Sequence, residues 1–390
     1  MQEFDVIIVG AGMVGASAAN LLAPSGLNIA VIEAHFPSSF SFEQEMDLRV
    51  SAISLSSQQL LVAAGAWSNI REMRICPYRR LETWEQGGSG TKFSAVDIGY
   101  DKLGYIIENR VIQLGLLEAM KRHRNVQLFC PEKVAKLEQD ALTTRVTLDS
   151  GKRLQAKLVL AADGANSLIR QQAHIGINSW DYRQHCMLIN INTELPQQDV
   201  TWQEFAPTGP MAFLPLPGHK ASLVWYHQAK QIGYLSQLSK AALKVEIQQH
   251  FPDLVGEFEV TNHGSFPLVR RHAQQYYKGR VVLLGDAAHT INPLAGQGVN
   301  IGFKDVKVLC ELIRSAVIEG DAWDSQVLLQ QYQRSRLPDN MLMQTSMDLF
   351  YSVFSNNALP VRLLRNVGLA LADRAGPLKR QALRYAIGMS

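Results

Sequence analysis

The feature that most constrains the fold of this chain is a spaced set of glycines near its N-terminus, within FDVIIVGAGMVGASAANLLA. Residues 4–9 predict a short buried strand, residues 16–23 a helix, and residues 27–32 a second strand. The glycines between the first strand and the helix are Gly10, Gly12 and Gly15. In a G-x-G-x-x-G unit the first glycine permits a tight turn, the second lets a pyrophosphate approach the backbone, and the third lets the helix pack closely on the strand.

An acid, Glu33, directly follows the second strand. A carboxylate at this position accepts hydrogen bonds from an adenosine ribose, and it disfavours the 2′-phosphate of NADP in the same groove. The unit therefore predicts a Rossmann-like α/β domain that binds a dinucleotide at the N-terminus of its first helix. The alternative, a tight turn without a ligand and an ordinary surface acid, leaves the whole spacing unexplained.

The rest of the chain is large and only mildly charged. Its 390 residues suggest two domains, and 47% hydrophobic residues suffice for a sizeable core. A net charge of +3 is too small to indicate nucleic-acid binding. The four cysteines are scattered, so we expect no metal site or disulfide framework, and a cytoplasmic setting. No apolar stretch reaches the ~18 residues of a membrane-spanning helix.

Two further predicted strands also end in glycine and acid. The stretch LVLAADGANSLIR, residues 158–170, ends its apolar run at Asp163 and Gly164. The stretch VVLLGDAAHTINPLAGQGVNIG, residues 281–302, reaches Gly285 and Asp286 in the same way. A nicotinamide dehydrogenase needs only the first glycine unit. A longer, bent cofactor that touches three strand ends accounts for all of them.

These motifs resemble those of the FAD-dependent aromatic hydroxylases, the group that includes p-hydroxybenzoate hydroxylase. The matching residues are Gly10, Gly12, Gly15, Glu33, Asp163, Gly164, Ser167, Arg170, Gly285, Asp286, Pro293, Gly296 and Gly298. The resemblance implies an FAD-binding domain of the GR2 type, in which the N-terminal set holds the ADP half. It also implies that Asp286 bonds a ribityl hydroxyl and that Asp163 and Gly164 lie near the cofactor.

The resemblance implies further contacts around the flavin ring. Pro293 would lie beside the ring and help to place it. The backbone at the start of the following helix would stabilise the flavin carbonyl edge through Gly296, Gln297, Gly298, Val299 and Asn300. Arg49 and Asn109 occupy positions that contact FAD in relatives, although many relatives carry Arg or Gln at position 109. For His289, a structural role under the loop is favoured over proton transfer. No catalytic base for the substrate hydroxyl is identified.

Longer segments resemble the ubiquinone-biosynthesis branch of this family. They are DLRVSAIS, PYRRLETWE, GYIIENRVIQ and GDAAHTINPLAGQGVN, with SMDLFYSVFSNN and LKRQALRYAIG narrowing the match to hydroxylases of a polyprenyl benzoquinol. The resemblance implies a flavin monooxygenase that uses O2 through a flavin C4a-hydroperoxide. No second G-x-G-x-x-G is present, so NAD(P)H or another reductant would bind only transiently.

We expect the domains to be interleaved. The predicted FAD domain comprises residues 1–75, 99–175 and 264–320, and a mostly antiparallel β-sheet substrate domain comprises 76–98 and 176–263. A helical segment, 321–390, ends the chain. Candidates for the lining of the substrate cavity are Leu214, Pro215, Trp225 and Tyr226, with plain sheet core as the alternative for each.

The C-terminal stretch 359–390 mixes six basic residues with leucines around a single acid. Such a helix can lie on an anionic membrane surface, here the inner membrane, or dock on a ubiquinone-biosynthesis complex. The alternative is a helix packed on the FAD domain. Three other functions also remain open at this point: hydroxylation of another ring position, hydroxylation of a soluble aromatic acid, and a non-catalytic, FAD-bound role in a biosynthetic complex.

Overall fold

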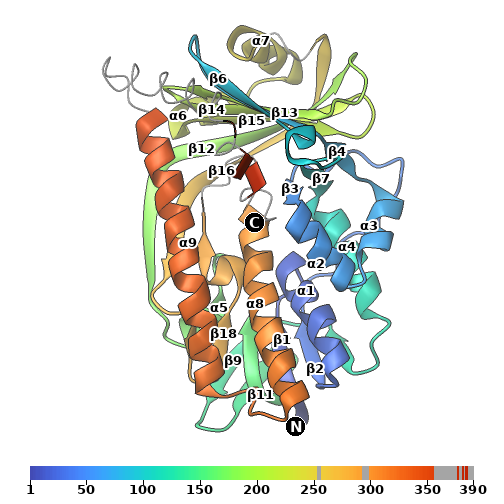
Figure 1. The fold of residues 1–390 in the computed structure, drawn as a ribbon, viewed down its shortest axis with the longest axis vertical. Helices are drawn as coiled ribbons and strands as arrows, with labels where there is room; N and C mark the ends of the chain where they lie inside the picture. Colours follow the sequence, from blue (N-terminus) through green and yellow to red (C-terminus); the bar gives the residue numbers. More distant parts are fainter. Residues whose placement is uncertain (253–255, 292–297, 355–375, 377–379, 382, 385–390) are drawn as a thin grey trace.

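The computed structural model describes residues 1–252, 256–291 and 298–354, with Gly376, Arg380, Gln381, Leu383 and Arg384. The molecule is elongated, with one sheet and its helices at one end and a second sheet across the other end (Figure 1). Two long helices, α8 (Gly298–Glu319) and α9 (Gln326–Phe354), run along its length.

The first sheet has the order β17-β18-β11-β1-β2-β8. These strands are β1 (Gln2–Val9), β2 (Ile29–Ile32), β8 (Val126–Phe129), β11 (Arg153–Ala161), β17 (Tyr277–Lys278) and β18 (Val281–Leu283). All pairings from β18 to β8 are parallel, and a hairpin of β9 (Val134–Gln139) and β10 (Thr144–Leu148) joins β11 antiparallel. Parallel strands end at one common edge, so the motifs after β1, β11 and β18 come together.

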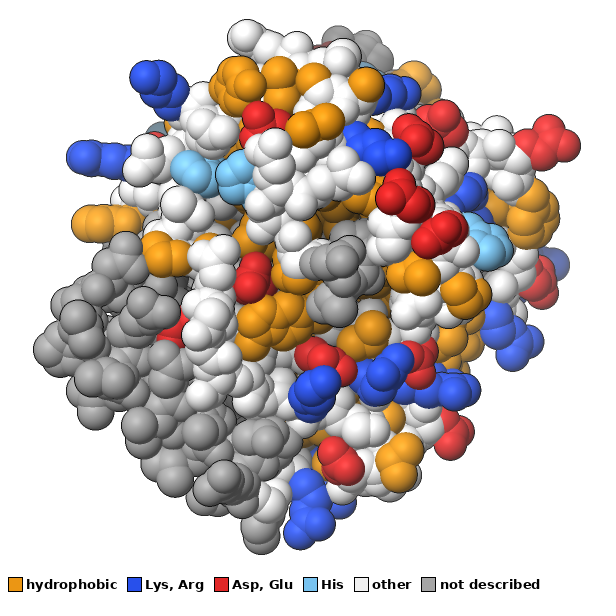
Figure 2. Space-filling view, turned by 90° about the horizontal axis from the view of Figure 1, so that it is seen from above, with side chains coloured by type: hydrophobic (Ala, Val, Ile, Leu, Met, Phe, Trp, Pro, Cys, Tyr) orange, Lys and Arg blue, Asp and Glu red, His pale blue; other side chains and the backbone are white. Residues whose placement is uncertain are grey.

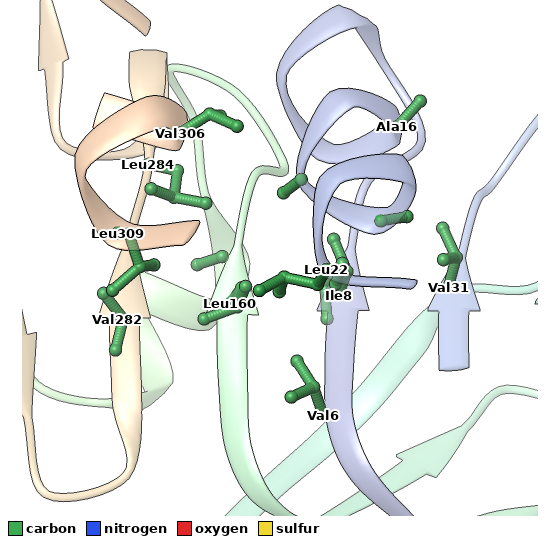
Figure 3. Close-up of a cluster of buried hydrophobic side chains, with 14 of the residues drawn as sticks. Val6, Ile8, Ala16, Leu22, Val31, Leu160, Val282, Leu284, Val306 and Leu309 are labelled. Atoms are coloured by element: carbon green, nitrogen blue, oxygen red, sulfur yellow. The ribbon is translucent and has the colours of Figure 1, made fainter. Parts of the chain in front are cut away.

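Helices cover this sheet and explain its apolar strands. One face packs against α1 (Met13–Leu22), which is flanked by α4 (Asn109–Met120) and α8. In Figure 3, Val306 and Leu309 of α8 lie over strand residues that include Val282, while Leu22 of α1 lies beside Ile8. A parallel sheet buried on both faces needs continuous apolar runs, which is what the N-terminal and 281–284 stretches supply.

The second sheet has the order β19-β16-β12-β15-β14-β13-β5-β6. The strands are β5 (Arg80–Glu85), β6 (Gly90–Ser94), β12 (Ile177–Thr193), β13 (Val200–Ala206), β14 (Gly209–Leu216), β15 (Lys220–Gln228), β16 (Phe258–Ala273) and β19 (His289–Thr290). Every pairing is antiparallel except β13 with β5. Helices α6 (Ala229–Leu235) and α7 (Lys240–His250) follow β15 and pack against this sheet.

A third, three-stranded sheet has the order β3-β7-β4. It consists of β3 (Val50–Ser54), β4 (Cys76–Tyr78) and β7 (Gly104–Glu108), with helices α2 (Leu55–Ala63) and α3 (Trp67–Met73) between β3 and β4. The remaining short elements are α5 (Leu168–Gln172), η1 (Ala23–Ser25), η2 (Ala95–Ile98) and η3 (Gly285–Ala287). Buried side chains of this small sheet form one cluster with those of β14 and β15, so it joins the two larger layers.

This architecture confirms the predicted α/β fold with an added, mostly antiparallel sheet and C-terminal helices. The predicted return to the cofactor domain at residue 264 falls inside β16, and the division into domains remains a prediction. Within the described ranges, no helix has the length and apolar character needed to cross a bilayer.

Candidate cofactor and substrate site

The first glycine turn leaves no room for side chains at two of its positions. Gly10 has φ +97°, and a Cβ there would lie 2.4 Å from the carbonyl oxygen of Ala162. A Cβ on Gly15 would lie 1.9 Å from the carbonyl oxygen of Gly10, because α1 packs directly on the turn. These contacts agree with the predicted roles of a tight turn and close helix packing.

The space beside Gly12 is open. Nothing lies within 4 Å of a Cβ built on this residue, which is the N-cap of α1, and no side chain caps the helix. The first N–H groups of a helix need partners, and the positive end of its dipole attracts anions. An uncapped helix start beside open space therefore fits the pyrophosphate of a dinucleotide.

Glu33 is tied to the same turn. Its carboxylate accepts hydrogen bonds from the N–H of Ala11 at 2.7 Å and from the N–H of His35 at 3.2 Å. The carbonyl of Ala11 accepts a bond from Gln113 of α4 at 3.0 Å. The half-buried acid is thus held at the glycine turn, where the predicted ribose would lie. Sequence reasoning missed Gln113, whose only signal is its place in GYIIENRVIQ.

The end of β18 presents a second acid to solvent. Gly285 has φ +56°, and a Cβ there would meet Val14 of α1 at 3.0 Å. The next residue, Asp286, keeps exposed surface. Surrounding protein nevertheless desolvates its carboxyl group and raises its pKa, while His289, Arg49 and Arg271 act in the opposite direction. An acid that is walled by protein but open to solvent is suited to bind a hydroxyl-bearing ligand.

The motif of residues 163–170 contacts the loop that contains Asp286. Asp163 accepts hydrogen bonds from the Ser167 hydroxyl at 2.5 Å and from the Ile169 N–H at 3.1 Å, and burial raises its pKa. Arg170, which is buried, donates to the carbonyl of Ala287 at 3.0 Å, one residue beyond Asp286. Gly164 has φ +80°. The motif shapes the loop at the strand edge, and direct contact of Asp163 and Gly164 with FAD remains a prediction.

Arg49 and Asn109 lie beside each other at the start of β3 and α4. The N–H of Asn109 donates to the carbonyl of Arg49 at 3.0 Å, and its side-chain oxygen accepts from Ser51 at 2.7 Å. The exposed Arg49 guanidinium lies over the ring of Phe266 at 5.7 Å and acts electrostatically on Asp286. Arg49 therefore lies between the acid and the second sheet, which is compatible with its predicted contact with FAD.

The start of α8 is joined to β3 and α2. The Asn300 side chain accepts bonds from the Ser54 N–H at 3.1 Å and the Ser57 hydroxyl at 2.7 Å, and donates to the Ala52 carbonyl at 2.8 Å. Its amide therefore holds protein elements together, so a flavin contact would involve its backbone. Gly298 and Val299 precede it in the same helix. The predicted residues Pro293, Gly296 and Gln297 lie outside the described residues.

The predicted cavity residues divide between the two faces of the second sheet. Leu214 and Tyr226 belong to the buried cluster shared with the three-stranded sheet. Trp225 instead packs under α7, with its ring 5.2 Å from that of Phe251. Pro215 follows Leu214 directly and, since side chains alternate along a strand, points to the same side as Trp225. The four residues therefore cannot all line one face of the sheet, and which of them meet the substrate remains a prediction.

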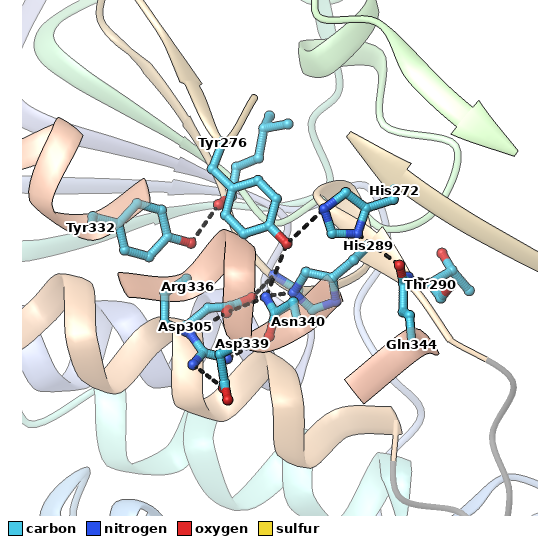
Figure 4. A network of polar contacts seen from close by, with 12 residues as sticks. His272, Tyr276, His289, Thr290, Asp305, Tyr332, Arg336, Asp339, Asn340 and Gln344 are labelled. Carbon is cyan, nitrogen blue, oxygen red and sulfur yellow. Dashed lines mark hydrogen bonds and ion pairs between the residues drawn. The ribbon is translucent and has the colours of Figure 1, made fainter. Parts of the chain in front are cut away.

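His289 has a structural position, as favoured from the sequence. Its Nε2 lies 2.5 Å from Oδ2 of Asp305, a fully buried acid in α8 (Figure 4). Arg336 of α9 donates to the other oxygen of Asp305 at 2.8 Å. Burial alone would raise the pKa of Asp305, but the charges and hydrogen bonds of His289 and Arg336 lower it below its ordinary value. Sequence reasoning missed Asp305 and Arg336; an acid among buried apolar positions of α8 is the only local signal.

Comparison with known proteins identifies related chains. A family model described as an FAD binding domain matches residues 3–345. The chain is 46% identical over 388 residues to the 3-demethoxyubiquinol 3-hydroxylase of Escherichia coli (strain K12), covering 100% of this chain and 99% of that protein. It is 34% identical to the ubiquinone hydroxylase UbiL of Rhodospirillum rubrum, covering 98% of this chain and 89% of that protein.

Solved structures share the fold at lower identity. The p-nitrophenol 4-monooxygenase PnpA from Pseudomonas putida DLL-E4 matches with a TM-score of 0.78 and 20% identity, over 99% of this chain and 97% of that one. PqsL of Pseudomonas aeruginosa, a probable FAD-dependent monooxygenase, has a TM-score of 0.78 and 19% identity, over 94% and 99% of the two chains. These two structures establish the arrangement of sheets and helices as a shared fold.

Proposed function

The chain belongs to the family of FAD-binding hydroxylases, and on that premise we propose that it hydroxylates the ring of a polyprenyl benzoquinol intermediate of ubiquinone biosynthesis. The proposed substrate is 2-polyprenyl-3-methyl-6-methoxy-1,4-benzoquinol, with O2 and NAD(P)H or another reductant as co-substrates. The observation that carries the proposal is the 46% identity, over the whole chain, with a ubiquinol hydroxylase. The match includes the second sheet as well as the glycine motifs.

The residues at the strand edge fit FAD. Open space beside Gly12 and the uncapped start of α1 suit its phosphates, and Glu33 suits the adenosine ribose. Asp286 would accept a hydrogen bond from the ribityl chain, and Arg49 would lie beside the flavin. When bound, FAD supplies the activation of O2. The start of α8 would direct its positive dipole end toward the flavin ring.

The ring that reacts would lie beside a buried apolar cluster under the second sheet, which would help to exclude water. Leu214 and Tyr226 come from β14 and β15, and Ile106 and Ala52 come from the three-stranded sheet below them. Excluding water near reduced flavin and O2 limits wasteful release of hydrogen peroxide. We identify no base for the quinol hydroxyl among the described residues that face this cluster.

The lipid tail would meet an apolar surface at the end of the molecule that carries the second sheet. Seen from the end that carries the second sheet, hydrophobic side chains gather near the middle with charged side chains around them (Figure 2). We also propose that residues 359–390 contact the membrane or a biosynthetic complex. Most of this segment lies outside the described residues. Of its described part, Arg380 and Arg384 are exposed and Leu383 is buried in the cluster that contains Tyr226.

The test is turnover of a short-tailed methoxy-benzoquinol by the purified, FAD-loaded protein. We expect one oxygen atom to be added to the ring per NAD(P)H consumed, measured by mass spectrometry. The matched control, Asp286→Ala, should lose this activity in proportion to its loss of FAD. Full FAD loading without ring hydroxylation would contradict the proposal. Hydroxylation of a soluble aromatic acid instead would identify the alternative enzyme class.

The ring position that is hydroxylated is best determined from the quinone lipids of cells. In cells that lack this protein, we expect one demethoxy or deoxy quinone intermediate to accumulate, measured by lipid mass spectrometry. Its mass distinguishes the proposed ring position from the other hydroxylation steps of the pathway. Unchanged quinone lipids would contradict a catalytic role and would favour neither ring position.

A further inference from the structure

Helix α9 presents an unusual polar stripe to the interior of the molecule. Its members are Tyr332, Arg336, Asn340 and Gln344, each four residues from the last. None of the four is more than 4% exposed. Residues four apart lie on one helix face, and the buried face of a helix is ordinarily apolar. The polar stripe therefore calls for a specific explanation.

The two outer members of the stripe contact the two ends of one short segment, residues 283–290. Tyr332 donates to the carbonyl of Leu283 at 2.8 Å, where β18 ends. Gln344 donates to the carbonyl of Thr290 at 3.3 Å, where β19 ends, and to that of Arg271 in the paired strand β16 at 2.9 Å. The two outer members of the stripe thus hold both ends of the segment that contains Asp286.

The middle members act through Asp305. Oδ1 of this acid accepts bonds from Arg336 at 2.8 Å and Asn340 at 3.1 Å (Figure 4). Its other oxygen accepts the N–H of Gly285 at 3.1 Å and contacts His289 at 2.5 Å. Asp305 therefore joins the helix to residues immediately before and shortly after Asp286.

The polar contacts of α9 are better explained by a need to fix atoms of the segment 283–290 than by a need to stabilise the fold. A buried ion pair is on balance no more stabilising than apolar packing of the same volume, because both charges must be removed from water. Directional hydrogen bonds, in contrast, fix atoms to within a few tenths of an ångström. An apolar stripe would attach α9 equally well, but it would leave the carbonyls of Leu283 and Thr290 without their bonds to this helix.

We propose that Asp305, Arg336, Asn340 and Gln344 are positioning residues for FAD, which hold the backbone of segment 283–290 so that Asp286 meets the ribityl chain. They do not themselves touch the cofactor. The proposal rests on the FAD role of Asp286 within the proposed function, and it is independent of which ring is hydroxylated.

The test compares Gln344→Met with Gln330→Met. Both variants replace an amide of α9 by a thioether of similar size, but Gln330 is exposed. We expect Gln344→Met to raise the FAD dissociation constant about three- to tenfold, since it loses hydrogen bonds that fix the segment. The absorption bands of the remaining bound flavin should also shift. Gln330→Met should match the wild type in both measurements.

A second variant, Asn340→Leu, removes bonds to Asp305 and Tyr276. Its FAD dissociation constant and flavin absorption bands are measured in the same way. The thermal unfolding of each FAD-free variant separates folding from positioning. Weaker FAD binding with little change in FAD-free unfolding supports the proposal. Wild-type FAD affinity and spectra in both variants, with or without lower stability, would overturn it. FAD binding is measured without a quinol, so failure of quinol turnover alone leaves this proposal standing.

Discussion

At the scale of single residues, two acids separated by 19 positions have opposite environments. Asp286 is open to solvent and its pKa is raised, whereas Asp305 is fully buried and its pKa is lowered. The difference follows from their partners, since His289 and Arg336 both contact Asp305 directly. Of these two acids, the one with charged partners is structural, and the one that faces solvent is available to a ligand.

Replacing Asp286 with Ala should weaken FAD without unfolding the protein. The variant loses a charge-assisted hydrogen bond worth about 1.5–3 kcal/mol, or about tenfold or more in affinity. The measurement is the FAD dissociation constant, with the unfolding temperature of the FAD-free protein as control. Full flavin occupancy and unchanged affinity after purification would show that Asp286 does not hold the cofactor.

The raised pKa of Asp286 also predicts a pH dependence of the FAD-free protein. An acid whose pKa is higher in the folded state favours folding when protonated, and this stability is lost as pH rises from the unfolded pKa through the folded one. Asp286→Asn removes the charge. The FAD-free variant should therefore be more stable than the wild type at neutral pH, with the difference shrinking as the pH falls through the raised folded pKa toward about 4. Denaturant titrations at several pH values test this, and an equal difference at every pH would contradict it.

Glu33→Arg should weaken FAD at the other end of the cofactor. The substitution removes the acceptor of the Ala11 N–H bond and places a cation where a ribose hydroxyl donor is expected. Glu43→Arg, at an exposed position of the following loop, is the matched control for the change of charge. Flavin binding equal to that of the control would mean that the adenosine lies elsewhere.

At the scale of elements, the glycine turn allows a sharper comparison. A Cβ at position 15 would collide with the Gly10 carbonyl, but a Cβ at position 12 would meet nothing. We expect Gly15→Ala to destabilise the FAD-free protein by about 3 kcal/mol or more. Gly12→Ala should leave FAD-free stability nearly unchanged and still impair FAD binding, because its methyl group fills the space for phosphate. Unfolding curves with and without FAD distinguish the two. Normal FAD affinity of Gly12→Ala would remove the phosphate assignment.

The same elements show what could be predicted from the sequence. The strand ends at Gly10, Asp163 and Asp286 carry local signals, because glycine or acid directly follows an apolar run at each of them. The sequence does not show which face of a buried strand each side chain occupies. In a sheet buried on both sides, Trp225 and Tyr226 are equally apolar, so alternation does not reveal which of them faces the cofactor layer.

The polar stripe of α9 escaped prediction for a different reason. Asn340 and Gln344 contact residues 35 to 73 positions away, and their own neighbours in sequence give no periodic signal. Buried polar groups are recognisable only when both partners are known. Sequence motifs thus predict the surface that meets the ligand better than the contacts that hold it in place.

At the scale of the whole molecule, α9 connects the end that carries the first sheet with the end that carries the second (Figure 1). α8 starts at the strand edge with the cofactor residues, and α9 extends to the second sheet, where Asp348 bonds Tyr182 and Arg270 (Figure 1). The chain then continues into the basic C-terminal stretch. One described residue of that stretch, Leu383, packs with the apolar cluster that contains Leu214. This described residue is therefore adjacent to the sheet face that carries Leu214.

Removing residues 359–390 should separate attachment from chemistry. We expect the truncated protein to bind anionic liposomes or partner enzymes less well, because it loses six basic residues and one acid. Hydroxylation of a short-tailed quinol should survive, since the cofactor residues lie outside the deletion. Liposome flotation, partner pull-down and turnover are the three measurements.

Two substitutions in the full-length chain control for lost packing. Arg380→Gln with Arg384→Gln removes exposed charge and keeps Leu383, whereas Leu383→Ala removes a buried side chain and keeps the charge. If charge drives attachment, the double variant should lose association more than Leu383→Ala does, and added salt should weaken the wild type in the same way. If the truncated protein folds and keeps both associations at full strength, the C-terminal stretch is a helix packed on the protein and not an attachment site.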